Sequence, residues 1–226
     1  RCQSPNMLRA VLVLVLAVTI VEGSPRIHKP DPTCSTDQAK ACLDSYFASY
    51  GFPAGQLPSY TDYVAKIIDL TTHFGANGVD VFCSLEVTLE NCMGDQFNSP
   101  CMTASAFQQM YGTDIFDAFE FAADLQMRAY MCNNKQFMKD NLSCFNDVDT
   151  KYADERRKCA ADVINAIANV ADGDYCTPWS NFVTCTDDVY VKHCGDNVKG
   201  FICTIMETGI NFDSESVCNG SMPKCG

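Results

Sequence analysis

Cysteine is the residue whose number and spacing most clearly predict chemistry in this sequence. The chain has 15 cysteines among 226 residues. That is far more than a cytosolic enzyme of this size carries, and it is typical of an oxidised, disulfide-rich protein. The sequence contains no Cys-x-x-Cys pair and its three histidines are scattered. A structural zinc site and a thiol redox centre both favour such pairs, so we expect disulfides, no metal and no other cofactor.

Fourteen of the cysteines lie beyond the first 33 residues, and an even number can pair completely. Their spacing alone leaves the pairing open, because fourteen cysteines allow on the order of a hundred thousand arrangements. The predicted disulfide cysteines are Cys34, Cys42, Cys83, Cys92, Cys101, Cys132, Cys144, Cys159, Cys176, Cys185, Cys194, Cys203, Cys218 and Cys225.

Several of these cysteines recur at intervals of nine residues, and this interval constrains the pairing. Nine residues turn an α-helix by about 900°, a net half-turn, and advance it by about 13.5 Å. A disulfide requires Cα atoms roughly 4.4–6.8 Å apart. Two cysteines at this interval on one helix must therefore each reach a different helix. The alternative is that some lie at helix ends, next to loops that reverse the chain. Both arrangements predict a layered helical array with cross-links.

Other catalytic or metal-binding patterns are weak. His28, His73 and His193 are expected in a tail or near helix ends, and the Gly-x-Ser-x-Gly pattern of serine hydrolases does not occur. Residues 147–154 begin like a calcium-binding EF-hand loop, but Lys151 and Tyr152 stand where a ligand and a glycine are required. We predict no catalytic residue and no metal site. An enzyme whose site assembles only on folding remains the third-ranked hypothesis.

The N-terminal residues predict secretion. Met7 and Arg9 precede an apolar run from Ala10 to Val21, interrupted by Thr19. The run of about twelve residues is shorter than the roughly 20 that a bilayer span needs. With Gly23 as the cleavage position, we interpret residues 7–23 as a signal peptide and residues 1–6 as translated upstream sequence. We expect a secreted, extracellular product without a membrane span.

The sequence has two Asn-x-Ser motifs, and in a secreted protein such motifs are acceptors for N-linked glycans. We predict glycosylation at Asn141 and Asn219.

The composition predicts a folded acidic protein. The formal net charge is −12 and 47% of the residues are hydrophobic, which is enough to build a core. The chain lacks the basic excess that neutralises phosphates, so we do not expect nucleic acid as a partner.

Apolar residues follow helical spacing almost throughout, and we predict an all-α fold. Residues 24–33 contain three prolines and are expected to form a tail. Residues 34–226 are expected to form a single cysteine-rich helical domain. The predicted helices run over residues 35–47, 59–74, 79–93, 103–111, 114–130, 133–145 and 147–171, and a further helix begins at Thr177.

A trace of internal repetition leaves open a duplication of one helical half. Shifting the sequence by 93 residues places Cys83, Cys92, Cys101 and Cys132 on Cys176, Cys185, Cys194 and Cys225.

The segment Cys176-Thr-Pro-Trp-Ser-Asn-Phe-Val-Thr-Cys185, followed by Val189 and Cys194-Gly195, resembles a nematode family of secreted, helical, twelve-cysteine domains of unknown function. The regular Cys-x8-Cys spacing also resembles that of insect haemolymph glycoproteins. Both resemblances extend over about residues 34–225. They imply a secreted helical module and provide no catalytic residue.

The functional prediction is a secreted, acidic, disulfide-rich helical protein with a binding or structural role. One alternative is a component of an extracellular matrix in a mineralised tissue such as shell. A second is a carrier of a small apolar ligand, for which a stripe of aromatic and methionine side chains could line a pocket. The stripe consists of Phe116, Phe119, Phe121, Met127, Tyr130 and Met131.

Overall fold

The computed structural model describes residues 34–97, 100–170, 176–213, 218 and 221–225, and within these residues the regular structure is entirely helical. The all-α prediction is thereby confirmed. The predicted leader and the tail at residues 24–33 lie outside the described residues, as does Asn219. None of the described helices has both the length and the apolar content required to cross a bilayer.

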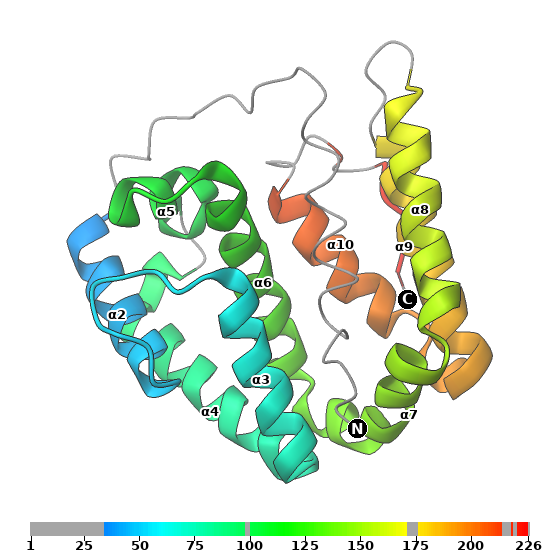
Figure 1. Ribbon diagram of the computed structural model, residues 1–226, viewed down its shortest axis with the longest axis horizontal. Helices are drawn as coiled ribbons and strands as arrows, with labels where there is room; N and C mark the ends of the chain where they lie inside the picture. The colour runs from blue at the N-terminus through cyan, green and yellow to red at the C-terminus, as the bar shows by residue number, and fades with distance from the viewer. Residues whose placement is uncertain (1–33, 98–99, 171–175, 214–217, 219–220, 226) are drawn as a thin grey trace. The chain divides into compact units, whose positions relative to one another are not determined.

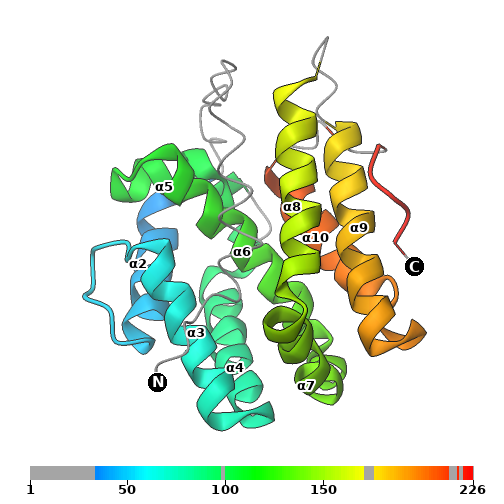
Figure 2. The ribbon, with the colours of Figure 1, turned by 45° about the vertical axis from the view of Figure 1, so that its right-hand side comes forward.

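The described residues divide into two compact units, residues 34–135 and residues 136–225. We call them the N-terminal unit and the C-terminal unit, and Figures 1 and 2 show the helices of each. A single domain over residues 34–226 stays a prediction.

The N-terminal unit consists of five α-helices and two 3-10 turns. The helix α4 packs against α2, α3 and α6, and α5 packs against both α2 and α6. The elements are α2 (Thr36–Ser49), α3 (Tyr60–Phe74), α4 (Ala76–Met93), η1 (Gly94–Gln96), η2 (Pro100–Met102), α5 (Ala104–Tyr111) and α6 (Ile115–Asn133).

Local sequence signals explain how α3 begins and why α4 follows it so closely. Ser59 caps α3, because its hydroxyl accepts a hydrogen bond from the backbone N–H of Asp62 at 3.2 Å. Gly75 separates the two helices with a φ of 54°, a value that glycine adopts readily. A Cβ atom on Gly78 would lie 2.2 Å from the backbone oxygen of Leu70. The close approach of α4 to α3 therefore requires glycine at position 78.

The C-terminal unit contains four α-helices. The helices α8 and α9 lie side by side, and α10 packs against α9 (Figure 2). The elements are α7 (Lys135–Lys151), α8 (Ala153–Ala168), α9 (Cys176–Cys194), η3 (Asp196–Val198) and α10 (Phe201–Asp213).

The C-terminal unit differs from the sequence prediction in two ways. The helix boundary that was expected between residues 145 and 147 lies at Tyr152 instead, and α10 was not predicted. No glycine or proline marks position 152. The ring of Tyr152 stacks on the imidazole of His193 with centroids 3.6 Å apart. The position of the break therefore coincides with a contact to α9 that local propensity does not reveal.

Three disulfides cross-link the N-terminal unit, and they confirm the half-turn argument. Cys83 of α4 pairs with Cys132 of α6, whereas Cys92, nine residues later on α4, pairs with Cys42 of α2. The third disulfide joins Cys34 to Cys101. One helix is thus tied to two different neighbours.

Four disulfides cross-link the C-terminal unit, and three of them repeat the order found in the N-terminal unit. In each unit the first cysteine pairs with the fifth, the second with the fourth and the third with the sixth, once the additional pair Cys203–Cys225 is set aside. Six cysteines can pair in fifteen ways, so the shared order supports the duplication that the spacing left open. The counterpart of Cys132 is Cys218, however, and not Cys225 as the shift of 93 residues predicted. The repeated pairs are Cys144–Cys194, Cys159–Cys185 and Cys176–Cys218.

The seven pairs use every cysteine from Cys34 to Cys225, and each pair lies within one unit. These seven disulfides therefore cross-link each unit internally, and none of them joins one unit to the other.

This separation predicts the outcome of proteolysis. If a specific protease site is inserted between Asn133 and Asn134, cleavage should release two fragments that separate on a denaturing gel without reductant. The matched control is the same insertion at Gly55, inside the loop closed by Cys42–Cys92, where the fragments should separate only after reduction. Fragments that stay joined after cleavage at residue 133 would contradict the pairing.

Candidate functional site

The structure places most of the residues that the sequence singled out. Asn141 lies in the middle of α7, where its amide nitrogen donates to the backbone oxygen of Phe137 at 2.9 Å and its side-chain oxygen accepts from Asn197 at 3.1 Å. Glycosylation of Asn141 and Asn219 stays a prediction. His73 and His193 both lie in the last turn of a helix, as expected.

In the basic cluster Arg156-Arg157-Lys158, the structure shows that Arg156 is buried, which the sequence alone does not indicate. Arg156 is only 4% exposed and forms an ion pair with Asp149, whereas Arg157 is exposed and pairs with Asp154. The burial of Arg156 follows from its position on the buried face of α8, one turn before the buried Cys159.

The stripe proposed for an apolar ligand is divided between core and partly covered positions. Phe121 is completely buried and Met127 nearly so, whereas Phe119, Tyr130 and Met131 are half-buried. The side chain of Phe116 lies outside the described residues. Phe121 stacks on Phe107 and meets Phe47 edge to face, so aromatic rings fill the space that this part of the stripe faces.

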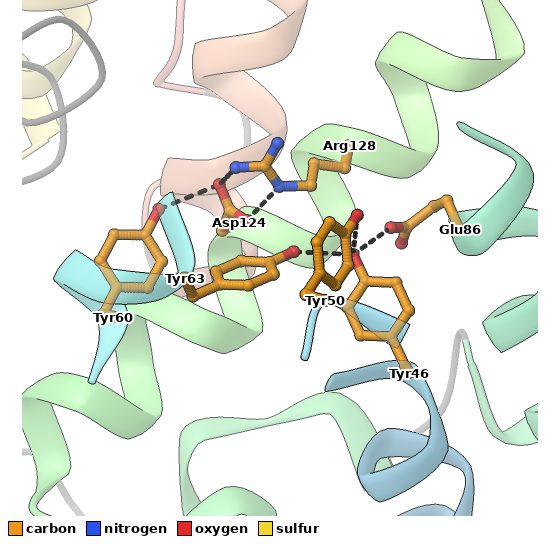
Figure 3. A network of polar contacts seen from close by, with 7 residues as sticks. All are labelled: Tyr46, Tyr50, Tyr60, Tyr63, Glu86, Asp124 and Arg128. Carbon is orange, nitrogen blue, oxygen red and sulfur yellow. Dashed lines mark hydrogen bonds and ion pairs between the residues drawn. The ribbon is translucent and has the colours of Figure 1, made fainter. Parts of the chain in front are cut away.

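A cluster of polar side chains that the sequence analysis did not identify lies inside the N-terminal unit (Figure 3). Four helices contribute to it, namely α2, α3, α4 and α6. We call it the tyrosine–carboxylate cluster, and its members are Tyr46, Tyr50, Tyr60, Tyr63, Glu86, Asp124 and Arg128.

Asp124 lies at the end of this cluster where the carboxylate has several hydrogen-bond donors. Arg128, one turn later on α6, donates from Nη2 to Asp124 Oδ1 at 2.9 Å and from Nε to Oδ2. The hydroxyl of Tyr60 also donates to Oδ1, at 3.0 Å. The guanidinium carbon of Arg128 lies 5.3 Å from the centre of the Tyr63 ring. Asp124 and Arg128 thus form a charge-assisted pair whose exposed fractions are 1% and 2%.

Glu86 occupies the other end and has a single hydrogen bond. The hydroxyl of Tyr46 donates to Glu86 Oε2 at 2.9 Å. The same hydroxyl contacts the hydroxyls of Tyr63 at 2.7 Å and Tyr50 at 3.5 Å. Oε1 of Glu86 is buried and has no hydrogen-bond partner among the described residues. Since Glu86 is 0% exposed, this oxygen has lost its hydration without replacement.

Burial decides the protonation of the cluster. It raises the pKa of Glu86 to about 8, against the opposing effects of the Tyr46 hydrogen bond and the Arg128 charge. Burial also raises the pKa of Tyr50 to about 12 and those of Tyr46, Tyr60 and Tyr63 well above their usual range. At neutral pH the cluster therefore holds neutral tyrosines, a mostly protonated Glu86 and one ion pair.

Two carboxyl groups in such different environments would suit an acid and a base in a catalytic site. Here, however, Glu86, Asp124 and Arg128 are each at most 2% exposed, and rings pack around them, with Tyr46 against Tyr50 and Tyr63 against Phe47. A substrate would have to displace these rings before it could touch either carboxyl group. The arrangement is suited to fixing four helices in one packing.

The C-terminal unit has a smaller cluster in which an aspartate, an arginine and a tyrosine again lie together. The hydroxyl of Tyr190 donates to Asp149 Oδ1 at 2.6 Å, and the guanidinium of Arg156, which pairs with Asp149, lies 5.7 Å from the Tyr190 ring centre. In the same unit Asp187 accepts the backbone N–H of Cys203 at 3.1 Å and that of Gly200 at 3.5 Å. Asp187 of α9 thus caps the N-terminus of α10.

Comparisons with protein-family models, with curated proteins and with solved structures find no match for this chain. The function must therefore be argued from the chain itself.

The buried pair predicts a large and asymmetric effect of mutation. Arg128→Met leaves Asp124 as an unpaired buried charge and should lower the free energy of unfolding by about 3–5 kcal/mol. The double variant Asp124→Leu with Arg128→Met removes both charges and should lose less. Chemical denaturation with the disulfides intact measures both.

The control for this pair is Lys151→Met, which removes an exposed ion pair with Asp147 and should destabilise the protein far less than Arg128→Met does. If Arg128→Met costs no more than Lys151→Met, the buried pair does not stabilise the unit as described.

The cap on α10 gives a second stability prediction. Asp187→Ala leaves two backbone N–H groups without an acceptor and should destabilise the C-terminal unit by about 1–2 kcal/mol. Hydrogen exchange should show faster exchange at Gly200 and Cys203. Asp188→Ala is the matched control, since Asp188 is its exposed neighbour. Equal effects of the two variants would refute the capping role.

Proposed function

We propose that this chain is a secreted, acidic helical protein with a binding or structural role, and that it is not an enzyme. The observation that carries the proposal is the position of its strongest interactions. Seven disulfides and the tyrosine–carboxylate cluster all act within the two units. Each disulfide contributes about 2–4 kcal/mol in typical proteins. Such a chain persists in an oxidising extracellular fluid without a ligand or metal to stabilise it.

A role in an extracellular matrix is the second candidate, and the charge of the N-terminal unit favours it. Residues 34–135 contain twelve acidic and four basic residues, and one of the four bases, Arg128, is buried in the ion pair with Asp124. The surface of this unit is therefore strongly negative, which suits contact with cationic matrix components.

A carrier of an apolar ligand requires an enclosed apolar cavity. In the N-terminal unit, rings occupy the interior that the aromatic stripe faces. In the C-terminal unit, a hollow of about 430 Å³ lies along α9, but it is open and its lining includes Asn181, Asp188 and Lys192. Neither feature favours an apolar cargo, so the carrier ranks below the matrix role.

The test is to purify the native protein from its source and to measure its intact mass before and after organic extraction. We expect a soluble extracellular protein whose mass is that of the chain without its leader, less two hydrogens per disulfide, plus any glycan. Reduction and alkylation should then add mass at fourteen cysteines. Release of one apolar molecule per chain would establish the carrier instead. Recovery only from a demineralised, insoluble fraction would establish the matrix role.

A further inference from the structure

Glu86 and Asp124 are both buried carboxyl groups of the tyrosine–carboxylate cluster, but only Asp124 has the partners that a charge requires. Asp124 accepts hydrogen bonds from Tyr60 and from two nitrogens of Arg128. Glu86 accepts one, from Tyr46, and leaves Oε1 without a partner among the described residues. An ionised carboxylate carries its charge on both oxygens, so a buried oxygen without a partner costs more free energy when the group is ionised than when it is neutral.

The groups around Glu86 do not provide a second cation. From α2 it faces Tyr46 and Tyr50, from α3 Tyr63, and from α6 Asp124 and Arg128, while Glu90 follows one turn later on α4 itself. The charge of Arg128 is already matched by Asp124. If Glu86 lost its proton, the cluster would hold two negative charges and one positive charge. Glu90 would add repulsion from the same helix.

We propose that Glu86 is a built-in proton-binding group, which in its neutral form allows α4 to pack against α2 and whose ionisation loosens that contact. The hydrogen bond from Tyr46 joins the two helices (Figure 3) and would strengthen on ionisation, so the cost falls on Oε1 of Glu86, which is buried without a partner among the described residues. Hydration of that oxygen requires α4 to move away from α2. The neighbouring disulfide Cys42–Cys92 also joins α2 to α4, so the contact loosens without separation of the helices.

The pH dependence has a defined sign. The folded-state pKa of Glu86, about 8, lies above the ordinary value of 4.5, because burial disfavours the charge. The folded unit therefore holds a proton that the unfolded chain releases between these two values. The contribution of Glu86 to stability is complete below about pH 4.5 and is lost as the pH rises to about 8. Across that window the contribution of Glu86 alone should raise the unfolding equilibrium constant about tenfold per pH unit. Loosening of the folded unit should follow above about pH 8.

The experiment compares the full-length protein with Glu86→Gln, an uncharged near-isostere. The free energy of unfolding should be measured at several pH values across the window. Its slope against pH should be smaller in the variant than in the unaltered protein, by the amount that corresponds to one proton. Above about pH 8, the protection of α2 and α4 from hydrogen exchange, taken relative to the intrinsic exchange rate at each pH, should fall in the unaltered protein and stay constant in the variant.

Glu120 is the matched control, because burial, with Asp117 next in effect, also raises its pKa to about 8, and it lies on α6. Glu120→Gln should also remove one proton from the slope, but α2 and α4 should still lose protection from exchange above the midpoint. Glu90→Gln, on the same helix as Glu86, should leave that loss of protection unchanged as well.

Infrared spectroscopy of the unaltered protein and of Glu86→Gln tests the protonation directly. The spectrum of the unaltered protein at neutral pH should contain a carbonyl band of a buried carboxylic acid that is missing from Glu86→Gln, and this band should vanish with a midpoint near pH 8. The proposal fails if the band that Glu86→Gln removes is absent at neutral pH. It also fails if α2 and α4 are equally protected from hydrogen exchange, relative to the intrinsic rate, below and above the midpoint.

Discussion

The half-turn that separates cysteines nine residues apart on a helix is the constraint on which both units depend. Because Cys83 and Cys92 point to opposite sides of α4, this helix has covalent partners on both sides, α6 and α2. The same geometry on α9 directs Cys176 and Cys185 to different partners, Cys218 and Cys159. A helix that is held from two sides must lie in the middle of its unit. The packing order of each array then follows from its cross-links.

Within this covalent frame, the buried polar groups determine the details of packing. Hydrophobic contacts alone would allow helices to slide or rotate with little change in energy. A charged pair such as Asp124 and Arg128 tolerates no such freedom, because a displacement of one side chain leaves the other uncompensated. The C-terminal unit contains a similar combination in Asp149, Arg156 and Tyr190. The two pairs do not occupy equivalent places, since Arg156 precedes the second cysteine of its unit and Arg128 the last of its own. The resemblance therefore reflects a shared physical requirement and not the repeat of the cysteines.

Much of the fold could be predicted from the sequence because helical periodicity and cysteine spacing are local signals. They predicted α3, which begins and ends at Ser59 and Gly75, and the opposite directions of Cys83 and Cys92. They missed α10, whose N-terminus is capped by Asp187 from another helix. Pairing of individual cysteines was also beyond prediction, since it depends on which helices meet.

The tyrosine–carboxylate cluster was missed for a related reason, although its sequence signal exists. Glu86 lies on the apolar face of α4, four residues after Phe82 and three before Leu89, all of them buried. Arg128 lies in the same way seven residues after Phe121 on α6. A charge in phase with an apolar stripe is a sign of a buried polar group, but the sequence does not indicate which partner satisfies it. That partner comes from a different helix for Glu86 and from the same helix for Arg128.

The location of these buried polar groups bears on function. A catalytic site keeps its ionisable groups at a surface that a substrate can reach, whereas this chain places its buried carboxyl groups among tyrosine rings and leaves a surplus of other acids outside. Its buried polar chemistry therefore supports the scaffold, and under the proposed function contact with other molecules falls to the exposed acidic residues. A protein built in this way is suited to persist and to bind through charge. Among the described residues, Glu86 is the carboxyl group with a buried oxygen that has no partner, and it is then the place where the pH of the surrounding fluid can act on the scaffold.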